Sequence, residues 1–172
     1  MKGIVIEPIV TSESPRELLK QHFKTIRELP IKGGWGYSME SAVIIDSDDP
    51  IVPRGGPFNG VGIEYEFVRA RIYEEMIIFQ SPGRKHCGIE WKLIVQRLAL
   101  GDNDKKYDVL RFDVTGLPEA DWDSLKAEWE GPDGIMSPDF DREAHDRRRE
   151  AALVHYIAEY WFDITSFFGR YD

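Results

Sequence analysis

A glycine-rich corner, GGWGYS at residues 33–38, is the first place where residue types and spacing could support chemistry. Glycine amides and a nearby lysine can together grip a phosphate. However, the Walker loop places its lysine after the glycines, whereas Lys32 precedes them here. The dinucleotide fingerprint also fails, because Met39 stands at the position of its last glycine. We therefore expect a tight turn whose glycines supply positive φ, with Trp35 and Tyr37 packed on the domain.

The same corner has a second interpretation, as an exposed loop that holds a protein partner. Tryptophan and tyrosine are common anchor residues at interfaces, and acidic side chains would complement a basic partner. In that case Trp35→Ala would weaken binding and leave the melting temperature almost unchanged, whereas a large drop would place Trp35 in the core. The residues expected to contact the partner are Trp35, Tyr37, Asp46, Asp48, Asp49, Glu64 and Glu66.

Carboxylates could also perform acid–base catalysis. Such a site needs two carboxyl groups in a cleft with separated pKa values, and a sequence shows neither. The chain has 31 acidic residues, so acids that are close in sequence carry little information. We keep a small enzyme with a carboxylate site as an alternative, and its candidate residues are Glu64, Glu66, Glu74 and Glu75.

Histidine and cysteine do not form a recognisable catalytic or metal-binding set. The histidines lack HxH, HxxxH and HExxH spacing, and they are His22, His86, His145 and His155. Cys87 follows His86 directly, but neighbours in extended chain point to opposite faces, so we interpret Cys87 as an inert thiol. A single cysteine forms no CxxC site, and no G-x-S-x-G motif is present. We expect no catalytic set, no metal site and no cofactor.

Composition disfavours several function classes. The net charge of -9, from 31 acidic and 22 basic residues, argues against nucleic-acid binding, although a local basic face such as Arg147, Arg148 and Arg149 could still exist. No apolar stretch approaches the ~20 residues that cross a bilayer, and MKGIVIEPIV does not have the form of a signal peptide. With only one cysteine, the expected location is the cytoplasm. A length of 172 residues without a visible linker predicts one domain, 1–172.

The clearest expected element is a β-hairpin at residues 89–114. Apolar and polar residues alternate on both sides of a turn at 101–104. That turn begins like a calcium-binding loop, but Lys106 occupies a ligand position and the required glycine is missing. Shorter strands are expected at 3–7 and 42–46.

Helices are expected between and after these strands. Ser14 and Glu17 have the spacing of a capping box, and the helix that they start would run to Pro30. Residues 63–79 fit both a helix and a strand, and we favour a helix over most of the segment. Residues 118–130 read as a short amphipathic helix.

A last helix is expected to begin in the charged stretch 141–150 and to continue to about residue 168. Its second half would carry a broad apolar stripe that packs on the sheet or forms a homodimer. The residues of this stripe are Leu153, Ile157, Trp161, Ile164 and Phe168. Together these elements predict an α+β fold, with an antiparallel sheet around the central hairpin and helices packed on one face.

A series of segments, taken together, resembles a group of small bacterial proteins of unassigned function. Some small acidic proteins of this general type are immunity proteins for secreted toxins. The resemblance implies a bacterial source and carries over no catalytic residue. The segments are GGWGYSMESAVIID (33–46), IEYEFVRARIYEEMII (63–78), IEWKLIVQRL (89–98), YDVLRFDVT (107–115) and DWDSLKAEWEG (121–131).

The expected function is therefore a non-enzymatic protein-binding module. Its most concrete form is an acidic, immunity-like or antitoxin-like inhibitor that covers a basic domain of a bacterial toxin. The carboxylate enzyme and a homodimeric structural subunit are the alternatives. No nucleic acid and no membrane is expected among its partners.

Overall fold

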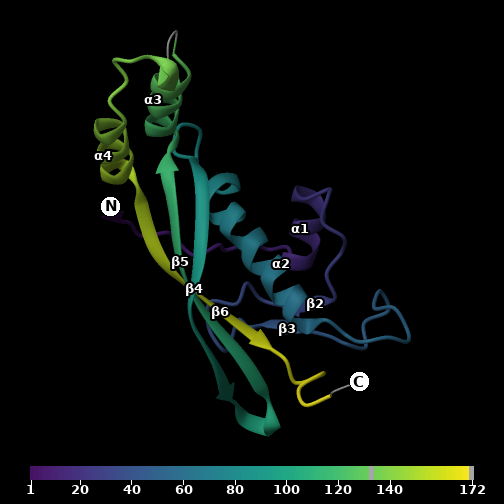
Figure 1. Cartoon of the computed structure of the whole chain (residues 1–172). Coiled ribbons are helices and arrows are strands. Elements are labelled where there is room, and N and C mark those ends of the chain that lie inside the picture. Colours follow the sequence, from purple (N-terminus) through teal and green to yellow (C-terminus); the bar gives the residue numbers. More distant parts are fainter. Residues whose placement is uncertain (132–133, 171–172) are drawn as a thin grey trace.

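The structure is a computed structural model that describes residues 1–131 and 134–170. The described residues form a mixed sheet in the order β2-β3-β6-β5-β4, and β1 also pairs with β6 (Figure 1). The strands are β1 Lys2–Gly3, β2 Ile31–Gly33, β3 Val43–Ile45, β4 His86–Leu100, β5 Lys106–Pro118 and β6 Val154–Asp163. The helices are α1 Pro15–His22, α2 Gly60–Tyr73, α3 Glu119–Glu130 and α4 Arg142–Ala152. A π-helix, Glu74–Ile78, continues α2, and short 3-10 turns lie at Asp102–Asp104 and Gly134–Met136.

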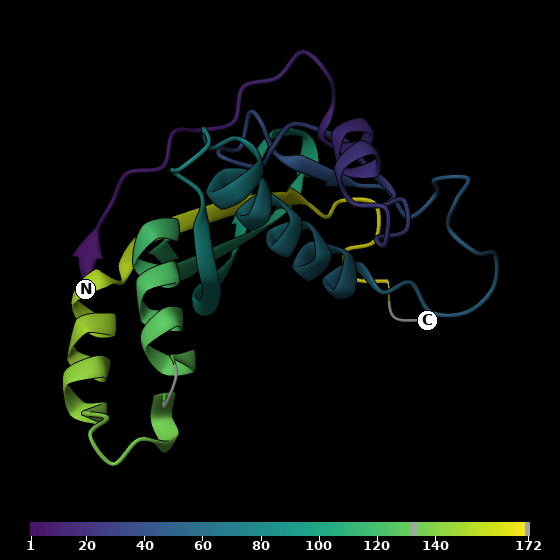
Figure 2. The same ribbon diagram turned by 90° about the horizontal axis from the view of Figure 1, so that it is seen from above.

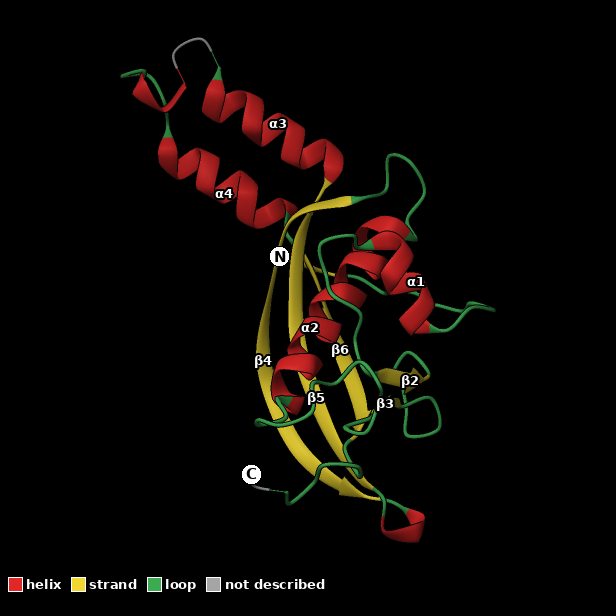
Figure 3. Cartoon of the chain, turned by 90° about the vertical axis from the view of Figure 1, so that its right-hand side faces the viewer, coloured by secondary structure: helices red, strands yellow, loops and turns green. Residues whose placement is uncertain are grey.

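The α+β prediction is confirmed, and the helices lie in two groups. Helices α1 and α2 lie over one face of the sheet, whereas α3 and α4 lie beside each other at one end of it (Figure 3). The sheet is mixed because β6 runs parallel to both β1 and β3, while its pairing with β5 is antiparallel. None of the described helices is both long enough and apolar enough to span a membrane.

The central hairpin is confirmed, with β4 paired antiparallel to β5 along its length. Its turn lies at Asp102–Asp104, where Asn103 and Asp104 both have positive φ, a conformation that these two residue types tolerate well. The pairing is irregular between Cys87 and Glu90 and between Leu93 and Val95. The turn end of the hairpin reaches beyond the helices (Figure 1).

The prediction of one long last helix is wrong in its second half. Helix α4 ends at Ala152, and the next residues form β6, which lies between β5 and the parallel strands β1 and β3. The segment was predicted as a helix because its apolar residues are four positions apart, which fits a helix face. Since four is an even number, the same spacing also keeps side chains on one face of a strand. Ile157 and Trp161 of the expected stripe therefore lie in a strand and not on a helix. Alternate residues of β6 are buried instead, namely Tyr156, Ala158, Tyr160 and Phe162.

Two further boundaries differ from the prediction. Ser14 caps α1, since its hydroxyl oxygen accepts a hydrogen bond from the Glu17 amide, but the helix ends at His22 rather than near Pro30. Phe23 then adopts an extended conformation and still packs against the core. The first strand is Lys2–Gly3, so it shares only Gly3 with the expected stretch 3–7, although the Ile4 amide adds one more hydrogen bond to β6.

Segment 63–79 is helical, as we favoured, and it forms the inner layer of the core. Phe67 of α2 has no exposed surface and meets Phe162 of β6 edge to face, with 5.7 Å between the ring centres. In the view of Figure 1, α2 lies between α1 and the long strands β4 and β5. The apparent ambiguity of this segment arose because both of its faces carry apolar residues, as expected for a helix that is buried on more than one side.

Candidate functional site

The glycine corner is a packed turn, as the first interpretation predicts. Gly33 and Gly36 both have positive φ, and a Cβ on Gly36 would lie 3.1 Å from a methyl group of Val43. The Trp35 side chain is 6% exposed, and its Nε1 donates to the Thr11 hydroxyl at 3.1 Å. Trp35 therefore belongs to the core and not to an exposed loop.

Tyr37 is half-buried and belongs to a polar cluster inside the domain. Its hydroxyl donates to Glu75 at 2.9 Å and accepts a hydrogen bond from the Ile9 amide. Its ring also lies over the guanidinium of Arg71, 4.2 Å away. Burial raises the pKa of Glu75, and the Arg71 charge opposes that rise. These contacts give Tyr37 a structural role inside the domain.

The acidic residues expected to contact a partner do not gather on one surface. Asp49 binds Arg16, whose guanidinium lowers the pKa of this carboxyl, and Asp46 lies 3.4 Å from the Lys32 ammonium group. Asp48 is exposed on the same loop. In α2, Glu64 is buried, while Glu66 is half-buried and lines a separate shallow hollow with Arg69.

The carboxylates of the enzymatic alternative are mostly buried. Glu74 has no exposed surface, and one of its oxygens lies 2.5 Å from the Nδ1 of His22. Burial raises the pKa of Glu74, and the contact with His22 lowers it. Glu75 contacts Arg71 instead, so it does not share a partner with Glu74. Burial also raises the pKa of the Cys87 thiol, which supports an inert thiol. No cluster of three or more His, Cys, Asp or Glu side chains suited to a metal occurs within the described ranges.

Strand β4 has an open edge. Strand β4 is the last in the sheet order, and no other described strand pairs with its outer side. It has 15 residues, which corresponds to about 50 Å of extended chain. Natural proteins usually protect such edges with charges, bulges or covering segments. Here the half near the turn carries exposed apolar side chains, namely Ile94, Val95, Leu98 and Leu100.

Helix α2 extends this apolar surface on the inner side of β4. Tyr65 packs edge to face on Phe112, and Phe112 pairs with Leu93 of β4. Val61 lies one turn earlier on the same helix face and is also exposed. We call the exposed residues on this side the β4–α2 surface, and they are Val61, Tyr65, Leu98 and Leu100. Leu98 and Leu100 are 51% and 66% exposed. Apolar side chains that gather in a patch, unlike single exposed leucines, mark interaction sites.

A buried carboxyl group lies beneath the β4–α2 surface. Glu64 is 2% exposed, and its Oε2 has no hydrogen-bond partner within the described part of the chain. Burial raises the pKa of Glu64 to about 9, and the neighbouring Asp108 carboxylate acts in the same direction. Asp108 lies opposite Leu98 in the sheet and accepts a hydrogen bond from Gln96. At neutral pH, Glu64 therefore keeps its proton.

This pKa predicts a pH-dependent stability. Because the folded-state pKa of Glu64 lies above its ordinary value of 4.5, the folded protein holds the proton more tightly, and its stability falls as pH rises from about 5 to 9. We expect Glu64→Gln to be more stable than the native protein at pH 8 and to show a weaker decline over this interval. Urea unfolding at pH 5, 7 and 8.5 measures how the free energy of unfolding changes with pH.

The control Glu66→Gln removes a carboxyl group from the same helix, away from Asp108, and should keep the pH dependence of the native protein. Equal pH dependence in all three proteins would contradict the raised pKa of Glu64.

Searches against protein-family models, curated proteins and solved structures find no match to this chain. The sequence did not indicate the candidate site, because the edge position of β4 depends on the strand order. One signal was present: the apolar pair Ile94 and Val95 interrupts the alternation of β4 at the place where the pairing shifts.

Proposed function

We propose that this chain is a non-enzymatic protein-binding module that takes up an extended segment of a partner protein along the free edge of β4. The observation that carries the proposal is a long edge strand, without a described strand partner, bordered by the exposed apolar side chains of the β4–α2 surface. In strand addition, backbone hydrogen bonds supply affinity, and side-chain contacts on alternate residues supply specificity.

The β4–α2 surface would select partner side chains on the inner face of the sheet. Leu98 and Leu100 lie on the same face of the sheet as Leu110, which is fully buried under α2. An added strand would place every second side chain against these leucines and against Tyr65. Asp108 would favour a basic or hydrogen-bond-donating residue among them, since this acidic side chain lies opposite Leu98 in the sheet.

In its most concrete form, the proposed module is an acidic, immunity-like inhibitor of a bacterial toxin. The net charge of -9 supports this form, because a negative field speeds association with a basic partner. Trp35 was expected to contact the partner, but it lies in the core. The apolar anchors in this proposal are Tyr65, Leu98 and Leu100.

Site-specific photocrosslinking tests the proposed surface in the native host. A benzophenone amino acid in place of Leu98 should form one dominant adduct with a partner, whereas the same probe in place of Val10 should not. Val10 is the matched control because it is 90% exposed and apolar but lies on the N-terminal segment. Once mass spectrometry identifies the partner, Leu98→Lys should weaken binding by about tenfold or more, as for an interface anchor. Val10→Lys should leave the affinity within twofold.

The outcomes separate the alternatives. An adduct with a second copy of this chain alone would replace the partner proposal with a homodimer. Equal adducts from both positions, or none from Leu98, would contradict the β4–α2 surface. The toxin-inhibitor form further requires that the identified partner lose its activity when bound, and a partner whose activity is unchanged would leave only the broader binding function.

A further inference from the structure

A second site lies between α3 and α4, at the end of the sheet away from the hairpin turn. The two helices and the end of β5 enclose a hollow of about 450 Å³, a size typical of small-ligand sites. The two helices form a separate arm at the edge of the molecule (Figure 2). The hollow therefore lies apart from the β4–α2 surface.

Aromatic side chains give the hollow a firm apolar wall. Trp129 and His145 line the hollow and also pack against Phe140, with centre-to-centre distances of 5.3 to 5.8 Å among the three rings. His145 is held in this group by Glu128, whose carboxylate lies 3.0 Å from its Nδ1. Trp122 lines the hollow next to Leu125. Two indole rings on one small hollow suit a flat aromatic ligand.

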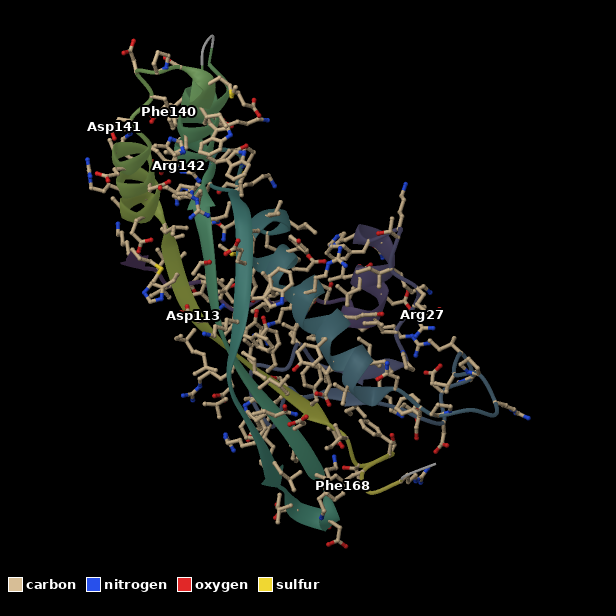
Figure 4. The ribbon with its side chains drawn as sticks, viewed as in Figure 1. Arg27, Asp113, Phe140, Asp141, Arg142 and Phe168 are labelled. Carbon is tan, nitrogen blue, oxygen red and sulfur yellow. The ribbon has the colours of Figure 1, made fainter. Side chains whose placement is uncertain are left out.

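Cations surround the same hollow. Arg142, Arg149 and Lys126 line it, together with the carboxylates Asp146 and Glu130. Figure 4 shows Arg142 beside Phe140 at this end of the molecule, and its guanidinium lies 5.6 Å from the Trp129 ring centre. Arg142 has only a long contact with Asp146, at 4.0 Å. A net positive hollow is unusual in a chain of charge -9.

The arginines of α4 divide according to the side of the helix. Arg147 pairs with Glu143 and Arg148 with Glu128, and neither lines the hollow. Arg149 and Lys126 do line it, and neither forms an ion pair with any residue that the structure describes. Their charges are therefore available to a ligand. Charge-assisted hydrogen bonds from such groups to a carboxylate are stronger than neutral ones.

We propose that the α3–α4 hollow binds an aromatic carboxylate, with the ring against Trp122 and Trp129 and the carboxylate on Arg149 and Lys126. A free small acid and the C-terminal aromatic residue of a peptide both present this chemistry. The same wall and the same cations would serve either source, because each offers one flat ring close to one negative group.

Calorimetry with defined probes tests this proposal. We expect 2-naphthoate to bind, and its uncharged analogue 2-naphthamide to bind about tenfold more weakly or not at all. Arg149→Gln should weaken 2-naphthoate about tenfold and leave 2-naphthamide unchanged, and Lys126→Gln should act in the same direction. Arg147→Gln, on the same helix but paired with Glu143, is the control and should change neither affinity by more than twofold.

Further measurements distinguish a free acid from a peptide end as the ligand, and they define the results that would overturn the proposal. The peptide acetyl-Gly-Gly-Trp with a free C-terminus should bind more tightly than 2-naphthoate if the site reads peptide ends, and more weakly if it takes free acids. Equal binding of 2-naphthoate and 2-naphthamide, or equal effects of Arg149→Gln and Arg147→Gln, would overturn the proposal. So would the absence of binding of both carboxylates at millimolar concentration.

Discussion

Arg71→Met is expected to lower the free energy of unfolding by about 3–5 kcal/mol, because it leaves a buried charge without its partner. The Arg71 side chain is 1% exposed and lies 3.4 Å from the carboxylate of Glu75. Its two terminal nitrogens donate to the carbonyls of Trp35 and Glu159, at 3.0 and 2.7 Å. The guanidinium thus ties the glycine corner to β6. Urea unfolding measures this loss, with the native protein and the variant compared at the same slope of unfolding free energy against urea concentration.

A double variant separates the charge effect from the loss of packing. Arg71→Met combined with Glu75→Gln removes the unpaired carboxylate and keeps an acceptor for the Tyr37 hydroxyl. We expect the double variant to be more stable than Arg71→Met alone, since the remaining buried group is neutral. A loss below about 1 kcal/mol in the single variant, or no recovery in the double variant, would contradict the role given to this ion pair.

The sequence predicts those elements whose local pattern has one meaning. The hairpin follows from alternation on both sides of a turn with Asn103 and Asp104 at its tip, and α1 begins where Ser14 can cap it. Strand β6 was missed because Ile157 and Trp161 are four residues apart, a spacing that both periods accept. The two-residue alternation of Tyr156, Ala158 and Tyr160 was the signal against a helix.

The candidate site was much less predictable than the fold. Arg71 and Glu75 look like an exposed helical pair, four residues apart, and only the packing of α2 on the sheet reveals that they are buried. Trp35 was a candidate anchor because it stands between glycines, but its aromatic type alone does not distinguish an interface anchor from a core residue. Leu98 became a candidate only when the strand order placed β4 at the edge. Burial and edge position are properties of the tertiary structure.

Trp35→Ala is expected to have the second large effect, and it decides between the two interpretations of the glycine corner. The indole is 6% exposed and packs against Phe67 with 6.2 Å between ring centres. Truncating a buried tryptophan to alanine costs about 3–5 kcal/mol, since apolar contacts are lost and a cavity remains. For a chain of this length, that corresponds to a drop in melting temperature of about 6–20 °C. Differential scanning calorimetry measures it.

Trp35→Phe provides the graded control, because it keeps most of the apolar volume and loses the hydrogen bond from Nε1 to Thr11. We expect Trp35→Phe to cost about 1 kcal/mol for that hydrogen bond, well below the cost of Trp35→Ala. An almost unchanged melting temperature in Trp35→Ala, together with weaker binding of a partner, would restore the exposed-anchor interpretation. A steep loss in Trp35→Ala and a small one in Trp35→Phe would instead assign the tryptophan to the core, so that partner binding must use other residues such as Leu98.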